Sequence, residues 1–210
     1  MQISRSALWA SAFSLALLPV LMSLLGLGLT SATEVVIFAM ACMALNVLVG
    51  FTGLVSFGHG AWFGLAAYAA ALAQLHWFEK SFWLPLGFGL LFISFVSLGF
   101  GFLILRRRGV YFSLLTLALC AMLYAVAFRW TAVTGGENGL GGIVRPSWIG
   151  FDLEQKFPFY VVVALIGMMT VFFLWRFHRS PIGSVLIAVR ENEQRASFIG
   201  YETVKYKLIA

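Results

Sequence analysis

The sequence predicts an all-α, polytopic helical membrane protein with about six transmembrane helices and a cytoplasmic coupling helix. Hydrophobic residues make up 61% of the 210 residues, charged residues make up 10%, and the mean hydropathy is +0.95. A typical soluble domain is about 45–50% apolar and about 25% charged, so a water-soluble globule is excluded. A disordered chain is also excluded, because disorder requires low hydrophobicity and high charge.

Six apolar runs are candidate spans, since crossing a bilayer takes about 20 helical residues. The first run is longer than the roughly 7–15-residue apolar region of a signal peptide, so we expect a retained helix, with a cleaved signal peptide as the alternative. The second run is short, and we expect it to begin before Glu34 or to be tilted or broken. The runs are residues 7–29, 35–49, 54–77, 82–105, 110–130 and 157–175.

Basic residues at the ends of these runs predict the topology. With a cytoplasmic N-terminus, ten Lys and Arg side chains fall inside and four fall outside. This ratio satisfies the positive-inside bias, so both chain ends are expected in the cytoplasm. Residues 1–178 then form the transmembrane region and residues 179–210 a cytoplasmic coupling segment. We attribute the net charge of +6 to this topology signal and expect no nucleic-acid partner.

A stretch rich in small residues separates the second run from the third. Residues 50–60 contain four glycines together with Thr52, Ser56 and His59. Such a stretch permits a helix break, which at membrane depth must be buried in protein or line a cavity, as in transporters. Gly60 and Gly64 form a GxxxG pair that predicts a close helix crossing, so pure packing is the alternative role.

His59 is a functional candidate because a titratable group inside a membrane span is costly. A hydrogen-bonded structural histidine is the alternative. The glycine-rich external loop at 134–142 is not followed by the Lys-Ser/Thr pair of a P-loop, and no metal-ligand or catalytic spacing is seen. We therefore expect no catalysis, metal or cofactor in this chain. Cys42 and Cys120 lie inside apolar runs and are expected to be buried thiols.

The segment after the sixth run predicts one short amphipathic helix over residues 181–199. Ser180 followed by Pro181 is typical of a helix start, and Gly200 stands where a left-handed C-cap residue would. An apolar stripe recurs at helical spacing in this segment. Such a helix either lies on the lipid surface or docks in a groove of a soluble partner. The stripe is formed by Ile182, Val185, Leu186 and Val189.

Three blocks of sequence together carry a family resemblance. They read ALNVLVG at 44–50 with SFGHGAWFG at 56–64, RGVYF at 108–112 with TGGENGL at 134–140, and RSPIG at 179–183 with AVRENE at 188–193. Their order and spacing resemble the permease subunits of branched-chain amino acid ABC transporters, of the LivM type. The match covers most of residues 35–210. It departs from the family pattern at Ser184, where a basic residue is usual, and at Gln194 and Arg195.

The resemblance implies an importer permease of a bacterial inner membrane that works by alternating access. Its partners would be a second homologous permease, two cytoplasmic ABC ATPase subunits that hydrolyse the ATP, and a periplasmic substrate-binding protein. We expect Ser56, His59 and Tyr111 to line the substrate path. The residues expected to couple the permease to the ATPases are Pro181, Gly183, Arg190, Glu191, Glu193, Ala196 and Gly200.

Other functions stay open on the sequence alone. A urea or short-amide ABC importer shares these blocks, and a passive channel would need no ATPase. A membrane enzyme lacks support from any catalytic pattern. Members of the family usually continue past the position of Ala210 with further spans, so we interpret the sequence as a fragment or a truncated product. A truncated product is expected to lack a complete translocation path.

Overall fold

The computed structural model describes residues 5–107, 109–145 and 152–210, and all regular structure in these ranges is helical. The chain divides into two compact units. Unit 1 is Met1–Thr52 with Gln155–Tyr206, and unit 2 is Gly53–Glu154 with Lys207–Ala210. The chain therefore passes from one unit to the other inside the glycine-rich stretch. The predicted division at residue 178 concerns membrane location, which these contacts do not test.

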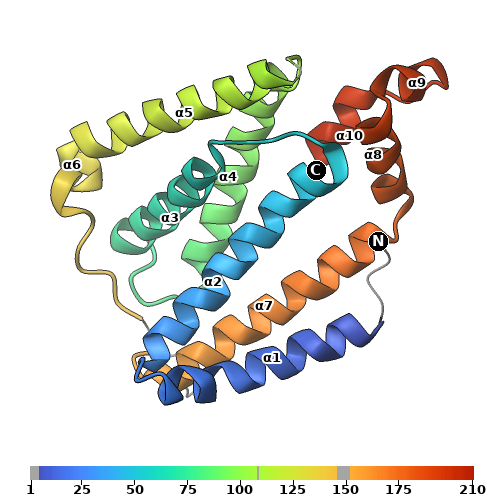
Figure 1. The fold of residues 1–210 in the computed structure, drawn as a ribbon. Helices are drawn as coiled ribbons and strands as arrows, with labels where there is room; N and C mark the ends of the chain where they lie inside the picture. Colours follow the sequence, from blue (N-terminus) through green and yellow to red (C-terminus); the bar gives the residue numbers. More distant parts are fainter. Residues whose placement is uncertain (1–4, 108, 146–151) are drawn as a thin grey trace. The chain divides into compact units, whose positions relative to one another are not determined.

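Three long helices lie side by side in unit 1, namely α1 (Arg5–Leu24), α2 (Leu29–Asn46) and α7 (Lys156–His178) (Figure 1). Their shared core is a narrow apolar stripe. At Gly167 an added Cβ would lie 3.0 Å from Val36 Cγ1, so α2 and α7 pack closely there. The buried residues of the stripe are Ala32, Val36, Tyr160 and Val163.

A glycine turn ends α1 earlier than the sequence predicts. The first run was expected to extend to residue 29, but Gly26 adopts a positive φ of 74° after Leu24. The amide of Gly26 donates to Ser23 O at 3.1 Å and the amide of Leu27 donates to Met22 O at 2.8 Å, which is a Schellman motif. The next helix then starts at Leu29. This confirms that the second helix begins before Glu34.

In unit 2, helix α3 (His59–His76) packs against α4 (Trp83–Ile104) and α5 (Val110–Arg129). The closest approach is at Gly89, where an added Cβ would lie 3.0 Å from Ala70 Cβ and 3.1 Å from Ala66 O. The loop after α5 carries the short helices α6 (Thr131–Thr134) and η2 (Gly136–Asn138). Small residues on both helices thus allow α3 and α4 to pack at short range.

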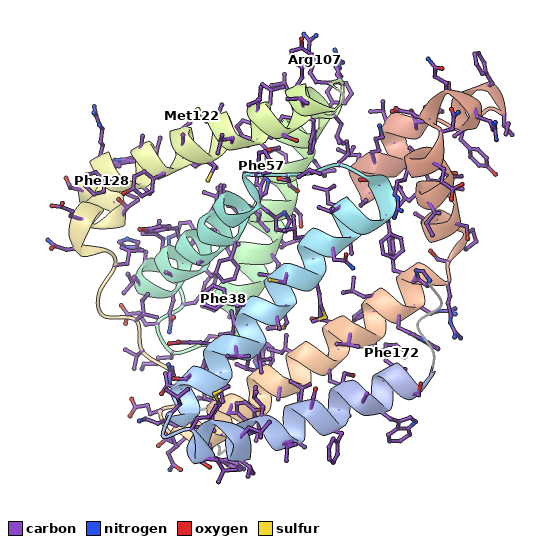
Figure 2. All side chains as sticks on the ribbon, viewed as in Figure 1. Phe38, Phe57, Arg107, Met122, Phe128 and Phe172 are labelled. Carbon is purple, nitrogen blue, oxygen red and sulfur yellow. The ribbon has the colours of Figure 1, made fainter. Side chains whose placement is uncertain are left out.

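Four of the described helices are long and apolar enough to cross a membrane, and a shorter apolar helix covers Leu8–Leu24. The all-helical membrane class is confirmed, whereas the number six is not. Large apolar side chains such as Phe38, Phe128 and Phe172 are exposed on the helix surfaces (Figure 2). Such exposure is ordinary against lipid, which is as apolar as these side chains. The four spans are Leu29–Phe51, Trp83–Ile104, Val110–Arg129 and Lys156–His178.

The prediction that both cysteines are buried is wrong. Cys42 is exposed and Cys120 is half-buried. In unit 1 the core stripe of α2 follows Ala32 and Val36. Cys42 lies outside that stripe, so its thiol is one of many apolar groups on the exposed surface.

The C-terminal segment forms α8 (Pro181–Glu191), α9 (Glu193–Phe198) and α10 (Thr203–Ile209), so the single helix predicted over 181–199 is wrong. The break is at Asn192, whose backbone is extended and whose Oδ1 accepts the amide of Arg195 at 2.8 Å. Asparagine is a favoured N-cap residue, so it starts a new helix instead of continuing the old one. The predicted cap at Ser180 is confirmed, because its hydroxyl accepts the amide of Gly183 at 3.2 Å.

We predict that Gly89→Leu destabilises unit 2 while Gly87→Leu, two residues away on α4, does not. A Cβ added at Gly89 would lie closer to α3 than ordinary van der Waals contact, whereas nothing lies within 4 Å of a Cβ added at Gly87. Overpacking at a tight contact costs about 1–3 kcal/mol. Heating both variants in detergent and measuring the monodisperse fraction by size-exclusion chromatography checks this, and equal melting midpoints would contradict it.

Candidate functional site

The glycine-rich stretch is a helix break, as the sequence predicts. Helix α2 continues into a π-helical turn, η1 (Val47–Phe51), and the chain then leaves helical geometry at residues 53–58 before α3 begins at His59. Gly53 adopts a positive φ of 72°, which glycine takes without strain. A π-helical turn is often found at functional sites. We call residues 53–58 the broken segment.

Two hydroxyl groups of α5 satisfy the backbone of the broken segment. The amide of Phe57 donates to Thr116 Oγ1 at 3.1 Å, and Ser113 Oγ donates to Val55 O at 2.6 Å. Both hydroxyl-bearing residues are buried. Water is absent from the bilayer core, so a break there needs partners of this kind from the protein itself.

Gly58 brings the broken segment against the backbone of α5. A Cβ added at Gly58 would lie only 2.0 Å from Thr116 O. The φ of Gly58 is −104°, which other residues adopt freely, so the requirement is for space and not for conformation. The close approach to α5 is therefore made by Gly58, which the sequence pattern did not single out for it. Cβ atoms added at Gly60 and Gly64 would meet nothing within 4 Å in the described structure, so the GxxxG pair does not make it.

An apolar pocket of about 610 Å³ begins beside the broken segment. It lies between α3, α4 and α5 and follows α3 from Gly60 to Trp77 and α5 from Cys120 to Trp130. Small-molecule sites typically measure about 300–1,000 Å³ and are mostly apolar. Gly60 and Gly64 form part of its wall, and no other atom lies within 4 Å of a Cβ added at either position.

The structure brings two of the three predicted path residues to the break. Ser56 is 7% exposed, and its hydroxyl has no hydrogen-bond partner among the described residues. His59 is half-buried at the first position of α3. Tyr111 is 73% exposed and lies apart, because it is two positions from Ser113 on α5 and each position turns a helix by about 100°. It lines a separate shallow depression with Arg107, Leu114, Leu115 and Ala118.

Sequence reasoning missed Ser113 and Thr116. Their signal was present, since two hydroxyl residues three positions apart in an apolar span lie on one helix face. The position of Phe57, the residue that Thr116 binds, is 59 residues away in the sequence. No local pattern indicates that pairing.

The C-terminal helices form the second candidate site. Gly183 is buried, and a Cβ added there would lie 2.6 Å from Phe177 O at the end of α7. Ala196 is 4% exposed. Glu193 accepts a hydrogen bond from Thr203 Oγ1 at 3.1 Å. These three predicted coupling residues therefore make contacts within the chain that hold α8 and α9 in place.

An exposed apolar tip follows α9. Phe198 is 89% exposed and Ile199 is 71% exposed. Gly200, with a φ of 101°, closes the helix: its amide donates to Ser197 O at 3.0 Å and the amide of Tyr201 donates to Ala196 O at 3.1 Å. The predicted C-cap is confirmed. The remaining predicted coupling residues, Pro181, Arg190 and Glu191, are exposed.

We predict that Gly58→Ala disrupts the break while Gly60→Ala is tolerated. The alanine methyl at 58 would overlap Thr116 O, whereas the methyl at 60 enters open space. Overpacking of this kind costs about 1–3 kcal/mol or more, so the yield of folded Gly58→Ala protein should fall. The yield of monodisperse protein in detergent measures this. Equal yields of the two variants would show that the close approach is not needed.

Comparison with known proteins identifies the family. A family model described as "Branched-chain amino acid transport system / permease component" matches residues 27–210. The "High-affinity branched-chain amino acid transport system permease protein LivM" of Salmonella typhimurium and that of Escherichia coli are each 28% identical to the chain over 202 residues. The alignments cover 85% of this chain and 47% of each relative, so the chain spans about half the length of these curated relatives.

No solved structure matches the chain significantly. The family model nevertheless extends over both units and includes the broken segment, α5 and the C-terminal helices. The chain therefore belongs to the permease-component family of branched-chain amino acid transport systems, a family of multi-pass membrane transporters.

Proposed function

We propose that the chain is the membrane-spanning permease subunit of an ATP-driven importer for leucine, isoleucine and valine in a bacterial inner membrane. The family and the LivM relatives support this cargo. The observation that carries the proposal is the two-helix segment α8–α9, which is fixed to α7 through Gly183 and ends in the exposed Phe198 and Ile199. This segment is suited to receive force from a partner.

The proposed partners at this segment are two cytoplasmic ATPases. Leu186 is 0% exposed and Val189 is 3% exposed, so the apolar face of α8 is already buried within the chain. A helix lying on lipid would need that face free. The apolar tip at Phe198 instead fits a pocket on a soluble partner, because exposed aromatic side chains are typical anchors of protein interfaces. The N-terminus and this segment are then cytoplasmic.

The proposed substrate path runs by the broken segment. Ser56 and His59 lie at the break, and the apolar pocket beside it suits an aliphatic side chain. Tyr111 would contact the path from the other face of α5. The permease would bind its cargo weakly, because the spans offer mainly hydroxyls and backbone dipoles.

The proposed partners outside the membrane and within it follow from this weak binding and from the family. Selectivity would depend on a periplasmic binding protein. A second homologous permease would complete the path. The chain itself would bind no cofactor.

Reconstitution tests this function. The complete gene product is placed in proteoliposomes with its partner permease, the two ATPases and the binding protein. We expect ATP-dependent uptake of radiolabelled leucine that excess isoleucine or valine suppresses. Uptake that urea suppresses instead would indicate the short-amide importer. Flux that continues without ATP or ATPases would indicate a passive channel and would refute the proposal.

We predict that Phe198→Ala weakens ATPase binding and that Phe128→Ala does not. Phe128 is 43% exposed on α5, so the control removes an exposed ring of the same type from a span. Truncating an interface anchor commonly costs at least 2 kcal/mol, which corresponds to roughly a thirtyfold weaker complex. Co-purification of the ATPases with each variant measures the effect. Undiminished co-purification with Phe198→Ala would place the docking surface elsewhere.

A further inference from the structure

The π-helical turn η1 is held from outside by the C-terminal segment. The carbonyl of Gly50 lies in the last helical turn before the break. Carbonyl groups at a helix end have no amide donor from a following turn. The guanidinium of Arg190, next to the last residue of α8, donates a hydrogen bond to this carbonyl. The two residues are 140 positions apart in the sequence and belong to the same unit.

Packing around this bond joins three elements of unit 1. The ring of Phe51 contacts those of Phe177 and His178 edge-on, with centroid distances of 5.9 Å and 5.2 Å. Those two residues end α7, and their carbonyls also receive the close approach of Gly183 at the start of α8. Helix α8 is therefore fixed to α7 at its first turn and to η1 at its last turn.

We propose that Arg190 is a positioning residue that links α8 to η1, so that a displacement of α8 moves the turn from which the broken segment starts. This inference rests on the proposed function. It differs from the role implied by the family resemblance, in which Arg190 faces the ATPases. The guanidinium reaches a carbonyl of its own chain instead.

The chain after η1 is built to follow such a displacement. Thr52 ends the helical region, and Gly53 has a φ of 72°, which lets the chain change direction without strain. Gly53 is the first residue of the broken segment, whose backbone bonds to α5 through two hydroxyl groups. A π-helical turn is rare and is frequently found at functional sites. Arg190 thus acts on a turn that only Thr52 separates from the broken segment.

The test uses Arg190→Ala, the conservative Arg190→Lys, and Arg195→Ala as a matched control on α9. Hydrogen–deuterium exchange of the purified protein in detergent reports on the turn directly. We expect exchange of the peptide covering residues 47–58 to rise about fivefold or more in Arg190→Ala, with partial recovery in Arg190→Lys. The Arg195→Ala control should match the wild type. Unchanged exchange in Arg190→Ala would overturn the link.

A transport experiment with the reconstituted importer distinguishes a positioning role of Arg190 from a role in ATPase docking. We expect Arg190→Ala to leave ATPase co-purification and ATP hydrolysis near wild-type levels and to lower the leucine imported per ATP about fivefold or more. Loss of co-purification would make Arg190 a docking residue, and an unchanged ratio would refute transmission. If the wild type imports nothing, the proposed function fails and the transmission role fails with it. The exchange data would then still show whether Arg190 holds the turn.

Discussion

The structure depends on one constraint, which is that backbone polar groups inside a bilayer must find partners in the protein. The chain interrupts a helix between Thr52 and His59, so the amides and carbonyls of the broken segment lose their helical partners. Ser113 and Thr116 supply two of the missing partners, and Gly58 allows the segment to come close enough to use them. Helix α3 and the pocket beside it follow from this docking, because both begin where the broken segment ends.

The same constraint applies to the end of η1 in unit 1. The Gly50 carbonyl belongs to the end of η1 and receives the guanidinium of Arg190. Gly183 allows α8 to meet the end of α7, and Asn192 then redirects the chain into α9. The residues that resemble a coupling motif thus divide into two kinds. Some hold the segment to α7 and η1, and others are exposed.

This division sharpens the proposed mechanism. An importer of the proposed kind needs a helix that moves as a rigid body with the ATPase and a segment near the substrate path that can change conformation. Helix α8 is fixed at both ends within unit 1, whereas the break contains Gly53, a glycine with a positive φ. Ser56 lies in the broken segment, where it is buried without a hydrogen-bond partner among the described residues.

The sequence by itself determined the membrane class, most helix positions, the break and both caps at Ser180 and Gly200, because apolar length and capping chemistry are local properties. It also contains Gly26 and Asn192, which end α1 early and start α9, but the apolar runs around them predict continuous helix. Only the tertiary structure decided that Thr116 binds Phe57 and that Arg190 binds Gly50. Those partners lie 59 and 140 residues apart, and a helix period shows which face a residue occupies but not which distant group that face will meet.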